Sequence, residues 1–182
     1  MLKDIQKQHT DKKVEVWFQD EARVGQQGRL TRIWSKRGDR PRMQKDMRFE
    51  YAYIYGAICP TRDTGEAIVV GVVNKEAMEK HLAVISESLP QDRHAVIVLD
   101  KAPWHKNLKV PQNITTLCLP SYSPELNPHE NVWEYLKNNF ISNTVFRDTE
   151  HVIDTCCTAW MSLCSEAGRI RSIGSREWAN ID

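Results

Sequence analysis

The chain has 182 residues and a formal net charge of +1, with 41% hydrophobic and 27% charged residues. This length fits one domain with a well-buried core, and the composition excludes disordered and fibrous proteins. No apolar run approaches the roughly 18 residues that a membrane helix needs, and the first residues lack the apolar core of a signal peptide. The five cysteines lack the CxxC spacing of zinc sites. We therefore expect one cytoplasmic domain with no membrane partner.

The charges are unevenly distributed along the chain. Residues 21–48 contain nine basic and three acidic residues, a local charge of +6 that leaves −5 for the remainder. Seven of the nine are arginines, whose planar guanidinium suits phosphate. From the pattern alone, a solvated surface explains such a run equally well. We predict nucleic-acid backbone contacts in this segment from Arg23, Arg29, Arg32, Lys36 and Arg37.

The first half of the chain predicts strands. Val14–Gln19 is rich in β-forming residues and is followed by the acidic pair Asp20 and Glu21, so we expect Asp20 at the carboxyl end of a strand. Turn-forming residues punctuate the segments that follow. Three further strands, typical of an antiparallel meander, are expected at Leu30–Trp34, Tyr51–Cys59 and Ala67–Val73.

The second half predicts helices and buried strands. From Asn74 the apolar spacing becomes that of an amphipathic helix, which Pro90 ends. His94–Leu99 and Ile114–Leu119 are short apolar runs, typical of strands buried on both faces, and Asp100 directly follows the first.

Two more helices complete the predicted domain. The stretch PSYSPELNP precedes a helix with Glu130 in its first turn, and a last helix should run from Asp148 to Ala167 before Gly168. The order of elements predicts an α/β domain with a mixed central sheet flanked by helices. We expect the domain at residues 14–168, after a lead-in at 1–13 and before a loose, basic C-terminal tail at 169–182.

Three carboxylates are candidates for chemistry. Asp20 and Asp100 follow apolar strands, and α/β sheets place functional groups at that edge. If the two strands are neighbours, both carboxylates project from one edge, and the helix that begins near Glu130 can bring a third. Mg²⁺ prefers oxygen ligands, and two ions about 3.5–4 Å apart can promote an in-line phosphoryl displacement. The pattern therefore predicts a metal site at Asp20, Asp100 and Glu130.

Structural roles explain the same residues equally well. Either aspartate can end a strand or cap a turn. Asn127, Pro128 and Glu130 have the spacing of a capping box, at the N-cap, N1 and N3 positions. A helix N-terminus also stabilises the charged carboxylate that a metal ligand requires, so capping and metal binding are compatible.

Three segments together resemble the catalytic blocks of the mariner-like superfamily of transposases, in particular its bacterial insertion-sequence branch. They are WFQDEARVG, IVLDKAPWHKN and LPSYSPELNPHENVWEYLK, within Val14–Phe140, and the last is the most specific. The resemblance implies a ribonuclease-H-like fold with a five-stranded mixed sheet. It also implies that Asp20, Asp100 and Glu130, rather than Glu125, are the catalytic and metal-binding residues, with Mg²⁺ or Mn²⁺ as cofactor.

The resemblance further implies an activity and partners. Such enzymes nick DNA hydrolytically at transposon ends and transfer the freed 3′-hydroxyl to target DNA, usually at a TA dinucleotide. We therefore expect a DNA partner, a homodimer on DNA and association with the bacterial nucleoid. A stand-alone nuclease or resolvase on the same fold, and a catalytically dead DNA-binding relic, are the alternatives.

Two details near the second aspartate extend the resemblance. Relatives keep a histidine five positions after it, so His105 is expected either to contact DNA or to buttress Asp100, with a merely packed, hydrogen-bonded histidine as the alternative. Lys101 stands where many relatives have asparagine. We expect Lys101 and Lys106 to contact phosphate.

The front of the chain departs from the family pattern. Relatives carry an N-terminal helix-turn-helix region that recognises the transposon ends, and 13 residues precede Val14 in this sequence. We therefore expect these 182 residues to lack end recognition, as a fragment, one half of a split reading frame or a decayed copy would.

Overall fold

A computed structural model describes residues 2–26, 35–38, 50–120 and 123–180. Its five strands form one mixed sheet in the order β3-β2-β1-β4-β5, in which β1 is antiparallel to β2 and parallel to β4. The strands are β1 (Lys13–Gly25), β2 (Tyr51–Cys59), β3 (Thr64–Val70), β4 (Arg93–Leu99) and β5 (Ile114–Cys118). The predicted five-stranded mixed sheet is confirmed. The strand expected at Leu30–Trp34 lies outside the described residues.

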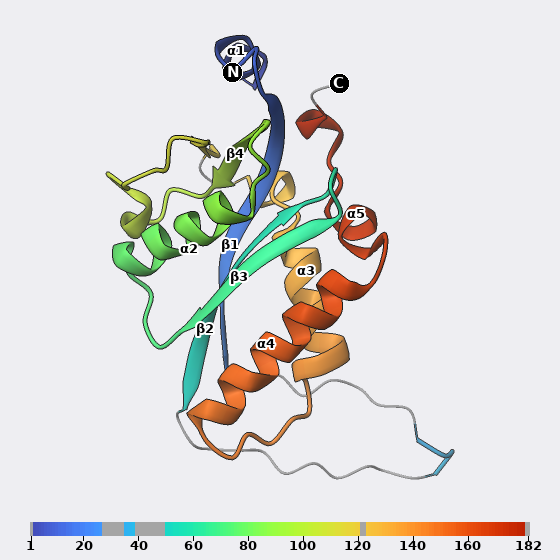
Figure 1. Cartoon of the computed structure of the whole chain (residues 1–182). Coiled ribbons are helices and arrows are strands. Elements are labelled where there is room, and N and C mark those ends of the chain that lie inside the picture. Colours follow the sequence, from blue (N-terminus) through green and yellow to red (C-terminus); the bar gives the residue numbers. More distant parts are fainter. Residues whose placement is uncertain (1, 27–34, 39–49, 121–122, 181–182) are drawn as a thin grey trace.

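Helices cover both faces of the sheet. They are α1 (Leu2–Gln8), α2 (Lys75–Ser88), α3 (His129–Leu136), α4 (Thr149–Ser165) and α5 (Arg169–Gly174). Short turns are η1 (Pro103–His105), η2 (Pro124–Leu126), the π-helical η3 (Lys137–Ile141) and η4 (Glu177–Ala179). Helix α2 lies on one face, and α3, α4 and α5 lie on the other (Figure 1). None of the helices in the described part of the chain is long and apolar enough to cross a membrane.

Alternating side chains of β1 divide the core into two clusters. Val16 and Phe18 pack toward α3, α4 and α5, whereas Trp17 packs toward α2. This is the period-two alternation of a strand, so consecutive residues further along β1 also face opposite sides. Asp20 therefore shares a face with Phe18, and Glu21 shares a face with Trp17.

Strand β1 is longer than predicted and does not end before Asp20. Its last residues stay paired with β2, with Glu21 opposite Tyr55 and Gly25 opposite Tyr51. Pairing with β4 stops earlier, at Phe18 opposite Val98. Asp20 and Asp100 each lie two residues beyond this last pair, so both carboxylates are at the same edge of the β1–β4 pair. The expected shared edge is confirmed, although β1 continues past it.

The C-terminal segment packs on the domain, so the expectation of a loose tail is wrong for residues 169–179. Ile170 and Ala179 are buried in the cluster beneath α3, α4 and α5, and Trp178 packs edge-on against Phe18 at 5.6 Å. Apolar side chains at these positions bury against the sheet, which outweighs the basic character of the segment. The domain boundaries at residues 14 and 168 stay predictions.

Gly56 of β2 is the register partner of Asp20 in β1. The absence of a side chain at Gly56 leaves room for two tryptophans to pack over the sheet. A Cβ at this position would lie 2.6 Å from Trp160 and 2.9 Å from Trp133. We expect Gly56→Ala to lower the free energy of unfolding by about 1–3 kcal/mol, because overpacking forces backbone shifts. Urea unfolding measures the change. Gly71→Ala is the control, because its Cβ would meet nothing within 4 Å, and equal losses in both variants would contradict this packing argument.

Candidate active site

Asp20 is held against helix α3. Its Oδ2 accepts a hydrogen bond from Trp133 Nε1 at 2.8 Å. Burial, with smaller contributions from the charges of Glu21 and Asp100, raises the pKa of Asp20 to about 6 despite this hydrogen bond. A carboxylate in such a position is poorly compensated at neutral pH. A bound cation or a proton would compensate the negative charge of the Asp20 carboxylate.

Asp100 directly follows β4 and is held through one of its oxygens. Oδ1 accepts a hydrogen bond from the backbone N–H of Ala102 at 2.9 Å and lies 2.9 Å from His105 Nδ1, which also lies 3.2 Å from the backbone carbonyl oxygen of Asp100. The hydrogen bond from His105, supported by the Ala102 N–H, keeps the pKa of Asp100 below its usual value. The side chain is 61% exposed. Asp100 therefore stays ionised and open to solvent.

His105 lies in η1, behind Asp100, and its side chain is only 2% exposed. Its second ring nitrogen, Nε2, lies 2.9 Å from Glu21 Oε1. The carboxylates of Glu21 and Asp100 and the backbone carbonyl of Asp100 only accept hydrogen bonds, so both ring nitrogens donate and the imidazole is charged. Burial lowers the pKa of His105, but the hydrogen bonds to Asp100 and Glu21 outweigh burial and raise it to about 10. This position fits the expectation that His105 buttresses Asp100.

Glu130 lies in the first turn of α3, and the start of this helix is hydrogen-bonded to the backbone of β1. His129 Nε2 lies 2.7 Å from the carbonyl oxygen of Phe18, and Asn127 Nδ2 donates to the carbonyl oxygen of Gln19 at 3.0 Å. Glu130 is exposed. It precedes Trp133, the hydrogen-bond donor to Asp20, by three residues, or about 4.5 Å along the helix axis. The hydrogen bonds of Asn127 and His129 to β1 therefore place Glu130 on the same side of the sheet as Asp20.

The start of α3 differs from the expected capping box by one residue. Pro128 is the N-cap, and Asn127 Oδ1 accepts from the N–H of His129 at 3.1 Å. The Asn127 side chain thus bridges the turn before α3 and strand β1. Within the described residues, no hydrogen bond of this turn involves the Glu130 carboxylate, and no three His, Cys, Asp or Glu side chains are close enough to hold a metal ion.

Comparison with known proteins identifies the family. The family model described as DDE superfamily endonuclease matches residues 15–153. The chain belongs to this family. The DDE domain is also 47% identical over 132 residues to the uncharacterized protein y4pE/y4sA of Sinorhizobium fredii (strain NBRC 101917 / NGR234), an alignment that covers 71% of this chain and 98% of that protein.

Solved structures show the same fold as this DDE domain. A Mos1 transposase paired-end complex with the left transposon end has a TM-score of 0.64 at 13% identity, covering 93% of this chain and 53% of that one. A Mos1 mariner paired-end complex with Mn has a TM-score of 0.60 at 12% identity, covering 96% and 60%. The ribonuclease-H-like fold is confirmed. The chain thus spans little more than half the length of these structures.

The basic residues predicted to contact DNA are only partly within the described residues of the DDE domain. Arg29 and Arg32 lie outside them. Arg23 is exposed on β1, with its guanidinium carbon 5.4 Å from the centre of the Tyr51 ring. The remaining predicted lysine and arginine contacts are also exposed, at Lys36, Arg37, Lys101 and Lys106. Arg23 follows the predicted catalytic residue Asp20 by three residues, and Lys101 and Lys106 follow Asp100 by one and six residues.

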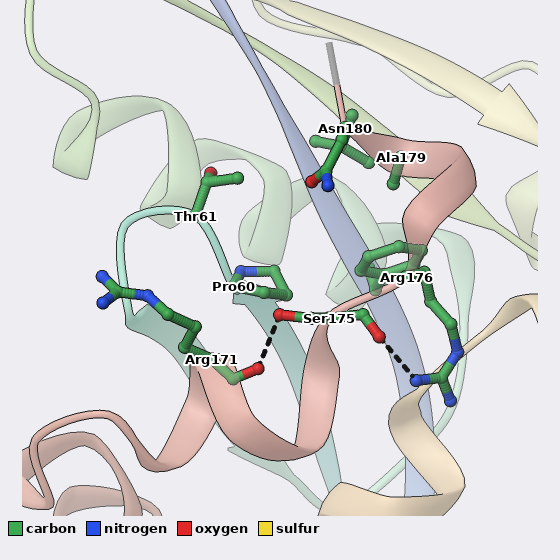
Figure 2. Close-up of a pocket in the computed structure, with 9 residues that line it drawn as sticks. Pro60, Thr61, Arg171, Ser175, Arg176, Ala179 and Asn180 are labelled. Atoms are coloured by element: carbon green, nitrogen blue, oxygen red, sulfur yellow. Dashed lines mark hydrogen bonds between the residues drawn. The ribbon is translucent and has the colours of Figure 1, made fainter. Parts of the chain in front are cut away.

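A cavity of about 360 Å³ lies apart from the predicted site of the DDE domain. Its base is formed by Phe18 and Val16 of β1, and its walls by the turn after β2 and the C-terminal segment. In Figure 2, the side chains of Arg171 and Arg176 extend in opposite directions around Pro60 rather than toward a shared point. The cavity therefore offers no converging pair of cations for an anion.

Sequence reasoning misses two contacts of the site. From the sequence, Glu21 is counted among the acidic residues of the 21–48 segment, and no role in the site is predicted for Glu21 or Trp133. Their partners are 84 and 113 residues away in the chain, at His105 and Asp20. The alternation of β1 is the one available signal, because it turns Asp20 and Glu21 to opposite faces.

Proposed function

We propose that the chain is the catalytic domain of a transposase, which cuts DNA phosphodiester bonds and joins a freed 3′-hydroxyl to target DNA. The observation that carries this proposal is the meeting of Asp20 and Asp100 at one sheet edge in a chain of the DDE endonuclease family. The Mos1 structures, which include a strand transfer complex, support it by analogy.

Divalent cations fit this pair of carboxylates. Burial, and to a lesser extent the charges of Glu21 and Asp100, disfavour the ionised form of Asp20, and an added positive charge would favour it. Asp20 and Asp100 would hold Mg²⁺ or Mn²⁺, since hard cations prefer carboxylate oxygens. Glu130 would complete the site by moving toward them, because no three such side chains of the described residues lie close enough together in this structure. When bound, the metal would activate the attacking oxygen and stabilise the leaving oxygen of an in-line displacement.

The protein's own residues then have three tasks. Trp133 holds one oxygen of Asp20, and His105 holds one oxygen of Asp100, so both carboxylates are oriented. Glu130 approaches from α3, whose first turn is fastened to β1. Lys101 and Lys106 are exposed and follow Asp100 by one and six residues, and they would contact DNA phosphates. Arg23 and the basic residues that follow it would extend this contact.

The proposal includes the assembly and the place of action. Transposition joins two transposon ends to one target, so two active sites must act together. We propose a homodimer on DNA, working at the bacterial nucleoid. The Mos1 neighbours are paired-end complexes, which supports such an arrangement.

A branched DNA substrate tests the proposal without needing end recognition. By microscopic reversibility, an enzyme that transfers a 3′-hydroxyl also reverses that step on a DNA that mimics the transfer product. We expect the chain with Mn²⁺ to release the branch and reseal the target strand, giving a longer labelled product on a denaturing gel. Shorter hydrolysis products alone would favour the nuclease or resolvase alternative. Binding without any chemistry would favour the catalytically dead relic.

A further inference from the structure

Glu21 and His105 form a buried charged pair on the face of the sheet opposite Asp20. The Glu21 side chain is 8% exposed and His105 2% exposed. Glu21 Oε1 accepts hydrogen bonds from His105 at 2.9 Å, from Gln19 Nε2 at 2.9 Å and from Trp104 Nε1 at 3.4 Å. A buried carboxylate is costly unless it is paired and hydrogen-bonded, and this one has three donors. Its arrangement is therefore well defined.

The pair connects the core to the exposed carboxylate of Asp100. His105 Nε2 lies 2.9 Å from Glu21 Oε1, and Nδ1 lies 2.9 Å from Asp100 Oδ1 and 3.2 Å from the Asp100 backbone carbonyl oxygen, so one planar ring links the two carboxylates. Within the described residues, the hydrogen bond from Ala102 and the ion pair with His105 both involve Oδ1 of the Asp100 side chain. Its other oxygen, Oδ2, is left for a ligand outside the protein. Without His105, a single backbone N–H would orient a side chain that is mostly in solvent.

We propose that Glu21 and His105 are positioning residues that orient the Asp100 carboxylate for a divalent cation. This rests on the proposed function, because it assigns a role to residues behind a proposed metal ligand. Because both side chains are buried, neither of them is proposed to contact the cation or the DNA directly. Hydrogen-bond partners of metal ligands commonly change metal affinity by 10–100-fold when replaced, because they hold the ligand in its binding orientation.

Mn²⁺ titration of the metal-free chain, followed by the loss of the free-ion electron paramagnetic resonance signal, tests the proposal. We expect His105→Gln and Glu21→Gln each to weaken Mn²⁺ binding about 10–100-fold. Glutamine keeps an acceptor at residue 21 without its charge, and at residue 105 it cannot reach both carboxylates. His81→Gln is the matched control, because His81 is a fully buried histidine whose Nε2 lies 3.1 Å from the carbonyl oxygen of Glu66.

Urea unfolding in EDTA, run on the same variants, separates positioning from stability. Weaker Mn²⁺ binding in the variants of Glu21 and His105, but not in an equally destabilised His81→Gln, supports positioning. Wild-type affinity in His105→Gln, or an equal loss in His81→Gln, overturns it. If wild type binds Mn²⁺ no better than Asp100→Asn does, the proposed metal site itself fails and the positioning role fails with it.

Discussion

Asp100→Asn is expected to reduce metal-dependent DNA cleavage by about a thousandfold or more. Loss of a metal ligand removes several kcal/mol of transition-state stabilisation, and each 1.4 kcal/mol or so corresponds to a factor of ten in rate. The fold should survive, because Asp100 is exposed and follows β4 rather than lying within it. Single-turnover nicking of supercoiled plasmid DNA in Mg²⁺ or Mn²⁺ measures the effect.

Asp92→Asn provides the matched control for this loss. Asp92 immediately precedes β4 at its opposite end and is exposed, with a long ion pair of 3.9 Å to Lys13. Exposed ion pairs of this kind contribute little to stability. We expect wild-type nicking from Asp92→Asn. Nicking by Asp100→Asn at a comparable rate would remove Asp100 from the active site and favour a contaminating or unrelated nuclease activity.

Asp20→Asn is expected to stabilise the metal-free chain by about 3 kcal/mol at pH 7.5, although it should abolish cleavage. Burial, opposed only in part by the Trp133 hydrogen bond, raises the pKa of Asp20 from 3.8 to about 6. A shift of about two units corresponds to about 3 kcal/mol, which the ionised carboxylate costs the folded state. Asparagine has nearly the same shape, carries no charge and still offers an oxygen to Trp133.

The stabilisation of the folded chain by Asp20→Asn should increase as the pH rises. Between pH 3.8 and about 6 the folded chain holds the Asp20 proton more tightly than the unfolded chain does, so wild-type stability falls as the pH rises through this window. The advantage of Asp20→Asn should therefore shrink to about 1 kcal/mol at pH 4.5. Urea unfolding in EDTA at pH 4.5 and 7.5 measures both values. A variant that is less stable than wild type, or a difference independent of pH, would contradict the buried carboxylate.

Loss of cleavage in Asp100→Asn and higher stability in Asp20→Asn would together show a metal site in which the Asp20 carboxylate lowers the stability of the metal-free fold. A carboxylate that is unfavourable in the empty fold becomes favourable when a cation compensates its charge. Asp20 has this character because it faces the packed side of the sheet. Asp100 differs, since its exposure and its hydrogen bond from His105 keep it ionised.

Local sequence patterns determined most of the secondary structure. Strand β2 spans Tyr51–Cys59 as predicted, and α2 begins after Asn74, whose side chain accepts from the N–H of Ala77 at 2.8 Å. Strand β4 begins one residue before the predicted His94. Such features depend on neighbours a few residues apart, so that periodicity and capping residues suffice to locate them. The family, too, is indicated by three short blocks of sequence.

Only the tertiary structure decided how the site is built. The extension of β1 past Asp20 depends on pairing with β2, which follows it by more than 20 residues. The contacts of Trp133 with Asp20 and of His105 with Glu21 depend on which helices pack on which face. The burial of residues 169–179 depends on an apolar surface formed by distant strands. Local periodicity shows which face of an element is apolar, but the packing of distant elements decides what that face meets.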